Sequence, residues 1–445
     1  MGQYFIGDFL KRIKRPIELD PNEEYKLVTI KMNHNGVVLR HLKQGSLIKS
    51  KMYQVKAGDF ILSGIDARNG AFGIVPPELD NAIVTNDFWY FKIEEDIISK
   101  ALFLELTATT WFDEICNKGS DGTTQRIRLQ KDKFFNQSVF LPKKEIQDDL
   151  LNKILEYRSG QNELFVEIQT QKQLIAQLKQ SILQEAIQGN LTQKWRKQNP
   201  DVEPASELLK RIKAEKAQLI KEKKIKKEKP LPPITEGDIP FELPIGWVWC
   251  RLGQIIVNSD NLNIQKELPQ DTIINYVDID AIDNKKHIIR EPKQEKVSNL
   301  SSRARRILKK GWVMYSLVRP YLQNLAIVDE DKEFYIGSTG FAVFDCIHSQ
   351  NRYLFQLLQS KYIEELYLSY MDGFNSPSIT HDQFKSTLIP LPTANEQKAI
   401  VEKVETLMGH CNALEQEITQ SEEHANILMQ AVLKEAFEGG KGQPA

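Results

Sequence analysis

The chain has 445 residues, a length that suggests roughly two to four domains. Its 59 Lys and Arg residues face 60 Asp and Glu residues, so the formal net charge is −1 and any basic surface must be local. The hydrophobic fraction of 41% and the lack of any run near the roughly 18 apolar residues of a membrane span argue against wholesale disorder and against a spanning protein. There is no signal-peptide pattern and the four cysteines are far apart, so we expect a cytoplasmic protein with reduced thiols.

The first predicted unit is a strand-rich globular domain over residues 1–143. Residues 25–30 and 58–63 are β-branched and aromatic runs that predict strands. A helical segment near residues 97–112 and a polar glycine loop over 119–126 follow them. This mixture predicts an α+β fold, a twisted sheet with flanking helices.

A long helix is predicted next, over residues 144–190. The stretch 145–188 has no proline and one glycine, Gly160, and its apolar residues recur in steps of three and four, which is the heptad signature. A helix of this length has an apolar stripe that needs a partner, although an ordinary long surface helix is the alternative. The predicted stripe consists of Leu150, Ile154, Tyr157, Leu164, Ile168, Ile175, Leu178 and Ile182.

A basic linker is predicted over residues 191–239. Between residues 207 and 229 there are ten Lys or Arg and four Glu, and Ser206 is a candidate cap for a helix over 206–229. The segment is either a solvated basic helix or a surface for DNA phosphates or a partner subunit. It also holds a chance match to a nuclease pattern, Pro200-Asp201 with Glu222-Lys223-Lys224, which no predicted strand frames.

The remaining chain repeats the first part. Pro392 lies 250 residues after Pro142, and the pattern of residues 182–187 recurs at 432–437 with the same offset. We therefore predict a second globular domain over 240–392, a second long helix over 393–438 and a tail over 439–445. The two helices are expected to pair as an intramolecular antiparallel coiled coil that separates the two domains.

Motifs for catalysis are missing from the sequence. There is no phosphate-binding G-x-x-x-x-G-K-[ST] motif, no G-x-G-x-x-G and no Asn-Pro-Pro-aromatic run of an amino methyltransferase. The seven histidines and four cysteines show no metal-ligand spacing. These absences favour a binding protein over an enzyme.

The sequence resembles the DNA-specificity (S) subunits of Type I restriction-modification systems. Residues 242–253 (ELPIGWVWCRLG) are similar to the start of a target recognition domain, and residues 388–398 are similar to the passage from such a domain into a conserved helix. Residues 191–196 and 207–215 resemble the family's central segment, and the duplicated order of domain and helix matches throughout. The first copy departs from the pattern, because it lacks Leu-Pro-x-Gly-Trp and begins at Gln3-Tyr4-Phe5-Ile6-Gly7.

The resemblance implies a non-catalytic subunit whose two recognition domains each read one half of a bipartite double-stranded DNA target. It implies that the helices act as a spacer and dock two methyltransferase (M) subunits, which bind S-adenosylmethionine and methylate adenine. Restriction (R) subunits, with ATP-driven translocation and cleavage, would join them. S-adenosylmethionine, ATP and Mg are thus cofactors of the partners, and none is expected in this chain.

Candidate DNA-contacting residues are the arginines and amides of the loops that differ between the halves, since bidentate Arg, Asn and Gln contacts distinguish bases. Tyr321 is a candidate for stacking. A coiled-coil scaffold without DNA specificity and a self-contained nuclease are the alternative functions. The candidates are Arg68, Asn69, Arg126 and Arg128 in the first half, and Arg303, Arg305, Arg306, Arg319, Tyr321, Gln323, Asn324, Asn375 and Ser378 in the second.

Overall fold

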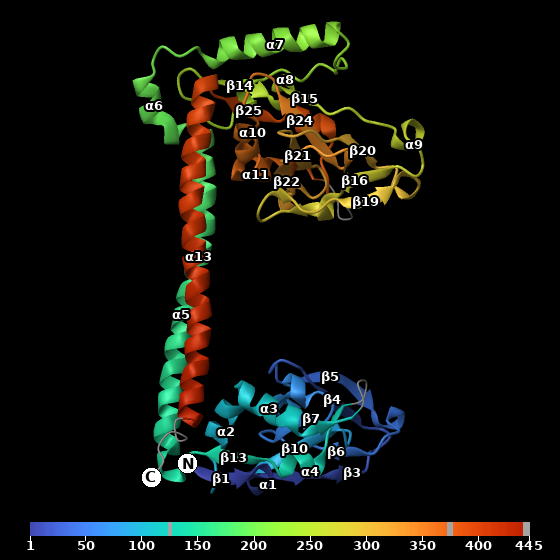
Figure 1. The fold of residues 1–445 in the computed structure, drawn as a ribbon, viewed down its shortest axis with the longest axis vertical. Coiled ribbons are helices and arrows are strands. Elements are labelled where there is room, and N and C mark those ends of the chain that lie inside the picture. The colour runs from blue at the N-terminus through green and yellow to red at the C-terminus, as the bar shows by residue number, and fades with distance from the viewer. Residues whose placement is uncertain (123–126, 372–376, 439–445) are drawn as a thin grey trace. The chain divides into compact units, whose positions relative to one another are not determined.

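The computed structural model describes residues 1–122, 127–371 and 377–438 (Figure 1). The chain divides into two compact units, Met1–Thr170 with Ile418–Ala445 and Gln171–Glu417, and each unit contains one globular half and a part of both long helices. None of the helices formed by the described residues has the length and apolarity needed to cross a membrane.

The globular half of the first unit is built on two sheets and a β-ribbon. Strand β4 covers the predicted strand at 25–30, and β7 covers most of the one at 58–63. The ribbon pairs β1 (Gly2–Phe5) with β13 (Ser138–Leu141), and a hairpin pairs β11 (Ser120–Asp121) with β12 (Arg128–Leu129). One sheet has the order β2 (Leu10–Ile13), β10 (Phe88–Ile93), β7 (Phe60–Ser63), β8 (Phe72–Ile74); the other has the order β3 (Pro16–Ile17), β6 (Met52–Gln54), β9 (Ile83–Val84), β4 (Glu24–Ile30), β5 (Val37–Gln44).

Four short helices complete this half. They are α1 (Ile6–Phe9), α2 (Lys100–Thr107), α3 (Thr110–Lys118) and α4 (Lys131–Phe135). The helical segment predicted near 97–112 is two helices, because the Thr109 hydroxyl caps α3 by accepting a hydrogen bond from Trp111 N at 3.2 Å. Aromatic rings from α2 and α3 form the core against β7: Phe60 lies 4.9 Å from Phe103 and 5.6 Å from Phe112, centroid to centroid.

The globular half of the second unit repeats this frame. Its ribbon pairs β14 (Val248–Arg251) with β25 (Leu388–Leu391), and a short hairpin pairs β17 (Ile282–Asp283) with β18 (Ile288–Ile289). Its helices are α8 (Leu252–Ile255), α9 (Ile264–Glu267), α10 (Asn351–Leu357), α11 (Lys361–Tyr370) and α12 (His381–Ser386). Its sheets have the orders β15 (Ile256–Asn258), β24 (Phe341–Cys346), β21 (Val313–Ser316), β22 (Leu325–Ile327) and β19 (Lys293–Lys296), β16 (Ile273–Val277), β23 (Tyr335–Ser338), β20 (Ala304–Ile307).

The duplication predicted from the sequence is confirmed strand by strand. The order β2-β10-β7-β8 in the first half matches β15-β24-β21-β22 in the second, and the ribbon β1–β13 matches β14–β25. The first copy therefore has the same opening strand without the Leu-Pro-x-Gly-Trp motif. The α+β class with repeated sheets and flanking helices is as predicted.

The long helices α5 (Lys144–Ile187) and α13 (Ala394–Glu438) pair antiparallel (Figure 1). In the first unit Gln161 Nε2 donates to the carbonyl oxygen of Ala425 at 3.2 Å. In the second unit Lys179 Nζ lies 2.9 Å from Asn412 Oδ1, and Thr192, just beyond the end of α5, bonds Glu396 at the start of α13. The predicted antiparallel coiled coil is thus confirmed.

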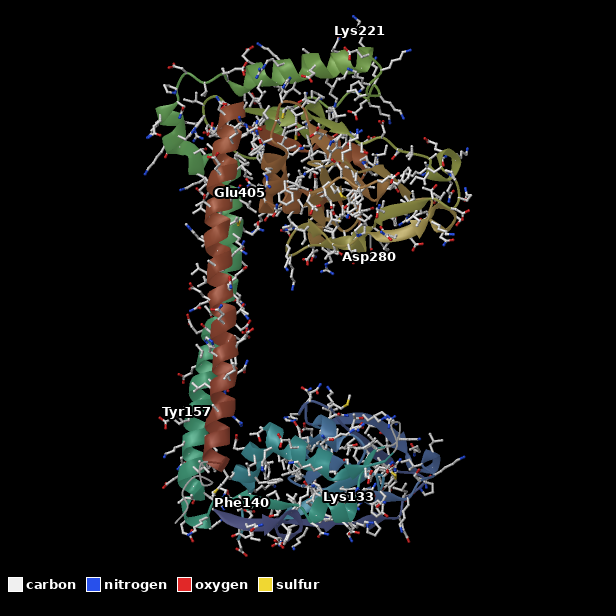
Figure 2. All side chains as sticks on the ribbon, viewed as in Figure 1. Lys133, Phe140, Tyr157, Lys221, Asp280 and Glu405 are labelled. Carbon is white, nitrogen blue, oxygen red and sulfur yellow. The ribbon has the colours of Figure 1, made fainter. Side chains whose placement is uncertain are left out.

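The buried seam of this pair is narrower than the heptad pattern predicts. One row at seven-residue spacing is buried, formed by Ile154, Ile168, Ile175 and Ile182 on α5 and by Val404, Cys411, Ile418 and Ala425 on α13. Five residues of the second predicted row are 41–60% exposed, because two helices alone cover only part of each apolar stripe. That row contains Tyr157, whose position on α5 is labelled in Figure 2, together with Leu164, Leu178, Leu414 and Leu428.

The linker is packed on the second unit rather than solvated along its length. After Gly189, which takes φ +76°, it forms α6 (Gln193–Gln198) and α7 (Ala205–Lys221). The predicted cap is wrong: α7 begins after Pro204 without a side-chain cap and ends at Lys221, labelled in Figure 2, because Lys223 turns into the left-handed region at φ +58°. Leu208 and Ile212 bury the inner face of α7.

A buried carboxylate ties the start of this linker to the second long helix. Glu396 is fully buried and accepts hydrogen bonds from Trp247 Nε1 at 2.7 Å and from the Thr192 hydroxyl at 2.7 Å. Arg196 forms an ion pair with the same carboxylate and also donates to the carbonyl oxygen of Gly189. Every oxygen of the buried charge is therefore satisfied.

Candidate nucleic-acid interface

The candidate residues gather around a short 3₁₀ turn that occupies the same place in both halves. In the first half η2 (Ala67–Asn69) follows β7, and in the second half η8 (Pro320–Leu322) follows the matching strand β21. The strands before the turns are equivalent, but the turn residues differ: Ala-Arg-Asn in one half and Pro-Tyr-Leu in the other. The two domains thus share the same backbone arrangement but carry different side chains at the turn after β7 and β21.

In the first half, the η2 turn and the β11–β12 hairpin lie together. Leu129 N donates to the carbonyl oxygen of Gly64 at 2.7 Å, and Gly64 N donates to that of Asp87 at 2.7 Å. Arg128 is exposed and paired with Asp87 at 2.9 Å. Of the candidates, Asn69 is exposed and Arg68 half-buried, and Arg126 lies outside the described residues.

The tip of the β4–β5 hairpin joins this cluster, which the sequence did not predict. Asn33 N donates to the carbonyl oxygen of Asn69 at 2.8 Å, and His34 N donates to that of Gly70 at 3.0 Å. The His34 ring contacts both carboxylate oxygens of Asp113 on α3 at 3.0 Å. The pair Asn35-Gly36 beside these residues is typical of a hairpin turn, but the contact with η2 joins positions far apart in the sequence.

In the second half, two residues in the left-handed conformation hold the η8 turn. Arg319 (φ +49°, ψ +58°) precedes it and Gln323 (φ +49°, ψ +42°) follows it. Arg319 N donates to the carbonyl oxygen of Pro377 at 2.8 Å, and Val318 bridges to Ser378, so that Arg319 and Ser378 lie near each other. Arg319, Ser378 and Tyr321 are exposed. The turn thus fixes exposed candidates in a backbone conformation that is costly for residues other than glycine.

Two other candidates at this turn differ in their access to a ligand. Asn324 is only 6% exposed, and its backbone carbonyl accepts a bond from Ser316 N at 2.9 Å, so it supports the loop from inside. Gln323 is half-buried, with its Nε2 3.5 Å from the carbonyl oxygen of Gln359. Asn375 lies outside the described residues.

The three arginines of the β20 segment point in different directions. Arg303 and Arg305 are exposed, whereas Arg306 is half-buried. A register irregularity between Ala304 and Arg306 re-aims the strand at this point. Arg306 contacts His381 Nε2 at 2.7 Å, and burial together with the Arg306 charge lowers the pKa of His381 to about 4. His381 is therefore neutral near pH 7 and accepts a hydrogen bond from Arg306.

Within the described ranges there is no group of three or more His, Cys, Asp or Glu side chains placed to hold a metal ion. The four cysteines are unpaired, and three of them are buried. Burial raises the pKa of Cys250 to about 12, so this thiol is protonated and unreactive near neutral pH. The arrangement is one of exposed basic and amide side chains on rigid loops.

Comparison with known proteins finds similarity to one family over part of the chain. Residues 244–423 match the family described as Type I restriction modification DNA specificity domain. The specificity subunit of the Type I restriction enzyme EcoAI from Escherichia coli is 36% identical over 249 residues. That alignment covers 53% of this chain but 40% of the relative's length.

Solved structures share the fold at low sequence identity. The HsdS subunit from Thermoanaerobacter tengcongensis has a TM-score of 0.54 at 17% identity, over 98% of this chain and 96% of that one. A chain from a structural study of complex assembly and conformational transition of the type I R-M system has a TM-score of 0.60 at 16% identity, over 98% and 97%. The predicted resemblance to specificity subunits of Type I systems is confirmed, and so is the predicted fold.

Proposed function

From its place among the Type I restriction-modification specificity subunits, we propose that this chain is the DNA-reading subunit of such a complex, and that each half reads one half of a bipartite target. The observation that carries this proposal is the pair of equivalent turns, η2 and η8, which a repeated frame presents with different residues. Two domains with the same fold and different turn residues are suited to a bipartite DNA target whose two half-sites differ in sequence. The sequence's division into domains at 1–143, 144–190, 191–239, 240–392 and 393–438 is part of this proposal.

The long helices are proposed to dock two methyltransferase subunits. The exposed apolar row, Tyr157 and Leu164 in the first unit and Leu178 and Leu414 in the second, offers a helical partner the kind of stripe that helix bundles bury. In this proposal the chain is non-catalytic and cytoplasmic and binds no cofactor. S-adenosylmethionine, ATP and Mg belong to the methyltransferase and restriction subunits.

Methylome sequencing of cells carrying the chain and its partners would reveal the target as a bipartite methylated motif. Arg319→Ala is expected to relax the sequence requirement in one half-site, and Arg68→Ala in the other, each by about 1–3 kcal/mol of discrimination. Arg352→Ala is the matched control, since Arg352 is an exposed arginine paired with Glu405 on α13. Equal weakening on all DNA would make the loop arginine a phosphate contact, and a motif in one continuous block would contradict the proposal.

The role of the helices as a spacer has its own test. Removing one heptad from α5 and the matching heptad from α13 keeps the buried row in phase, and it is expected to shorten the gap between the two half-sites. An unchanged gap would contradict the spacer.

The alternative functions are tested with the purified chain. The comparisons give no support to a scaffold without DNA specificity or to a self-contained nuclease. We expect no cleavage of DNA by the chain with Mg²⁺, and salt-dependent DNA binding when a methyltransferase subunit is present.

A further inference from the structure

A basic cleft lies between the linker and the globular half of the second unit. Its volume is about 600 Å³, and one wall is the linker stretch 224–231 while the other comes from β15, β20 and α12. Eight lysine or arginine residues line it, against three acidic residues. None of these residues belongs to the η8 turn, so the cleft is separate from the candidate base-reading loop.

Two of the three acidic residues of the cleft, Glu228 and Asp382, lie next to cations, and the third is Asp260. Glu228 is bonded by Lys385 Nζ at 2.8 Å, by Lys216 Nζ at 3.1 Å and by Asn258 Nδ2 at 3.1 Å. Asp382 lies 3.9 Å from Lys229. The carboxylates fix the linker to the domain, and the remaining positive charge of the cleft faces solvent.

Arg306 is a half-buried cation of this cleft that has no ion pair with a carboxylate among the described residues. Its guanidinium contacts the neutral His381 at 2.7 Å and a backbone carbonyl, Ser259 O, at 3.4 Å. Its Nε is buried and has no hydrogen-bond partner, and no carboxylate among the described residues forms an ion pair with it. A half-buried guanidinium without a carboxylate partner is stabilised by an anion bound in the cleft beside it.

We propose that this cleft binds phosphate groups of the duplex DNA backbone, with Arg306 and Lys309 as phosphate contacts beside the half-site that the second half reads. The inference rests on the proposed function and changes one part of it, because Arg306 then positions DNA instead of reading a base. The DNA backbone suits the cleft better than a free anion does. The lysines and arginines of the cleft are spread over the linker, β20 and α12, so a linear polyanion can contact several of them at once.

Salt dependence of DNA binding tests the proposal with the full-length chain. The association constant K for DNA falls as salt rises, and each lost phosphate contact makes the plot of log K against log [salt] less steep by about 0.9. That change corresponds to about eightfold lower affinity at 0.1 M salt. Lys309→Gln and Arg306→Gln are each expected to show this loss on a duplex of unrelated sequence and on the target. Lys309 is exposed, so its replacement does not disturb the core, and Lys266→Gln, an exposed lysine of α9 outside the cleft, is the control.

Three outcomes would overturn the proposal. One is a slope that stays unchanged in both variants. Another is a loss of target discrimination in Arg306→Gln without a change in slope, which would make Arg306 a base reader. The third is saturable binding of inorganic phosphate, followed by ³¹P NMR, that both variants abolish while their DNA slopes stay unchanged. Failure of the proposed function would look different, because the unaltered chain would then show no preference for the target.

Discussion

In both halves of the molecule a buried glutamine lies in the first turn of the long helix, but the residue before it differs. Gln147 and Gln397 are fully buried at equivalent positions. Gln147 accepts a bond from Ser99 N at 2.9 Å and donates to the carbonyl oxygen of Pro142 at 3.0 Å. Gln397 accepts from Gln350 N at 2.9 Å and donates to Pro392 O at 3.1 Å.

The residue before each glutamine has a different environment. Ile146 is 50% exposed, whereas Glu396 is fully buried and bonded to the linker residues Thr192 and Arg196. The glutamine occurs in both halves because each junction between a globular domain and its long helix has buried backbone groups that need a hydrogen-bond partner. Glu396 occurs in the second half alone because only that half has the linker attached at the start of its long helix.

The largest expected effect comes from removing the buried carboxylate. Glu396→Ala leaves Arg196 without its partner in a mostly buried site and is expected to destabilise the second unit by about 3–5 kcal/mol. Ile146→Ala, at the equivalent position of the first unit, is expected to cost about 1 kcal/mol or less. Urea denaturation followed by signals from each half checks this, and equal effects would mean that the two junctions are alike.

Matched glutamine variants test whether the frame is truly shared. Gln397→Leu leaves one backbone N–H and one carbonyl without this partner, Gln147→Leu leaves one N–H and two carbonyls, and each change is expected to cost about 1–3 kcal/mol. The loss should be confined to the unit that carries the change. Proteolysis and denaturation of the two variants would show it, and a strong effect in one half alone would contradict an equivalent role.

The turns after β7 and β21 both end in a left-handed residue, a conformation that favours glycine. A Cβ at Gly70, which has φ +72°, would lie 2.2 Å from His34 Cδ2, so Gly70→Ala is expected to destabilise the first unit by roughly 1–3 kcal/mol. Gln323 adopts φ +49° without being glycine, so Gln323→Gly is expected to stabilise the second unit by roughly 0.5–1 kcal/mol. Thermal unfolding measures both changes, and a loss of stability in Gln323→Gly would mean that its side chain holds the turn.

A pH dependence of stability is also expected from His381 in the second half. The pKa of His381 falls from the usual 6.5 to about 4 on folding, because the residue is buried and faces Arg306 and Lys385, with Asp382 acting in the opposite sense. The stability that comes from neutral His381 is thus complete above pH 6.5 and is lost as the pH falls through 4. His381→Gln keeps an acceptor for Arg306 and should flatten the difference in thermal stability between pH 7 and pH 4. An unchanged pH profile would contradict the burial of this histidine.

The sequence alone determined the duplication, the α+β class and the two long helices. These features have local causes: the heptad spacing and the lack of proline over 145–188 define a helix, and recurring patterns at a constant offset define a repeat. Local patterns also placed the strands at 25–30 and 58–63 within a few residues.

Tertiary structure decided the rest. Which heptad row is buried depends on how two helices far apart in sequence meet, so Leu164 is exposed while Ile168 is not. In the same way, Arg306 turns into a cleft because the linker returns over β20, and Asn324 is buried because β21 pairs with β22. These outcomes rest on contacts between distant residues, and the spacing of residue types along the chain does not contain them.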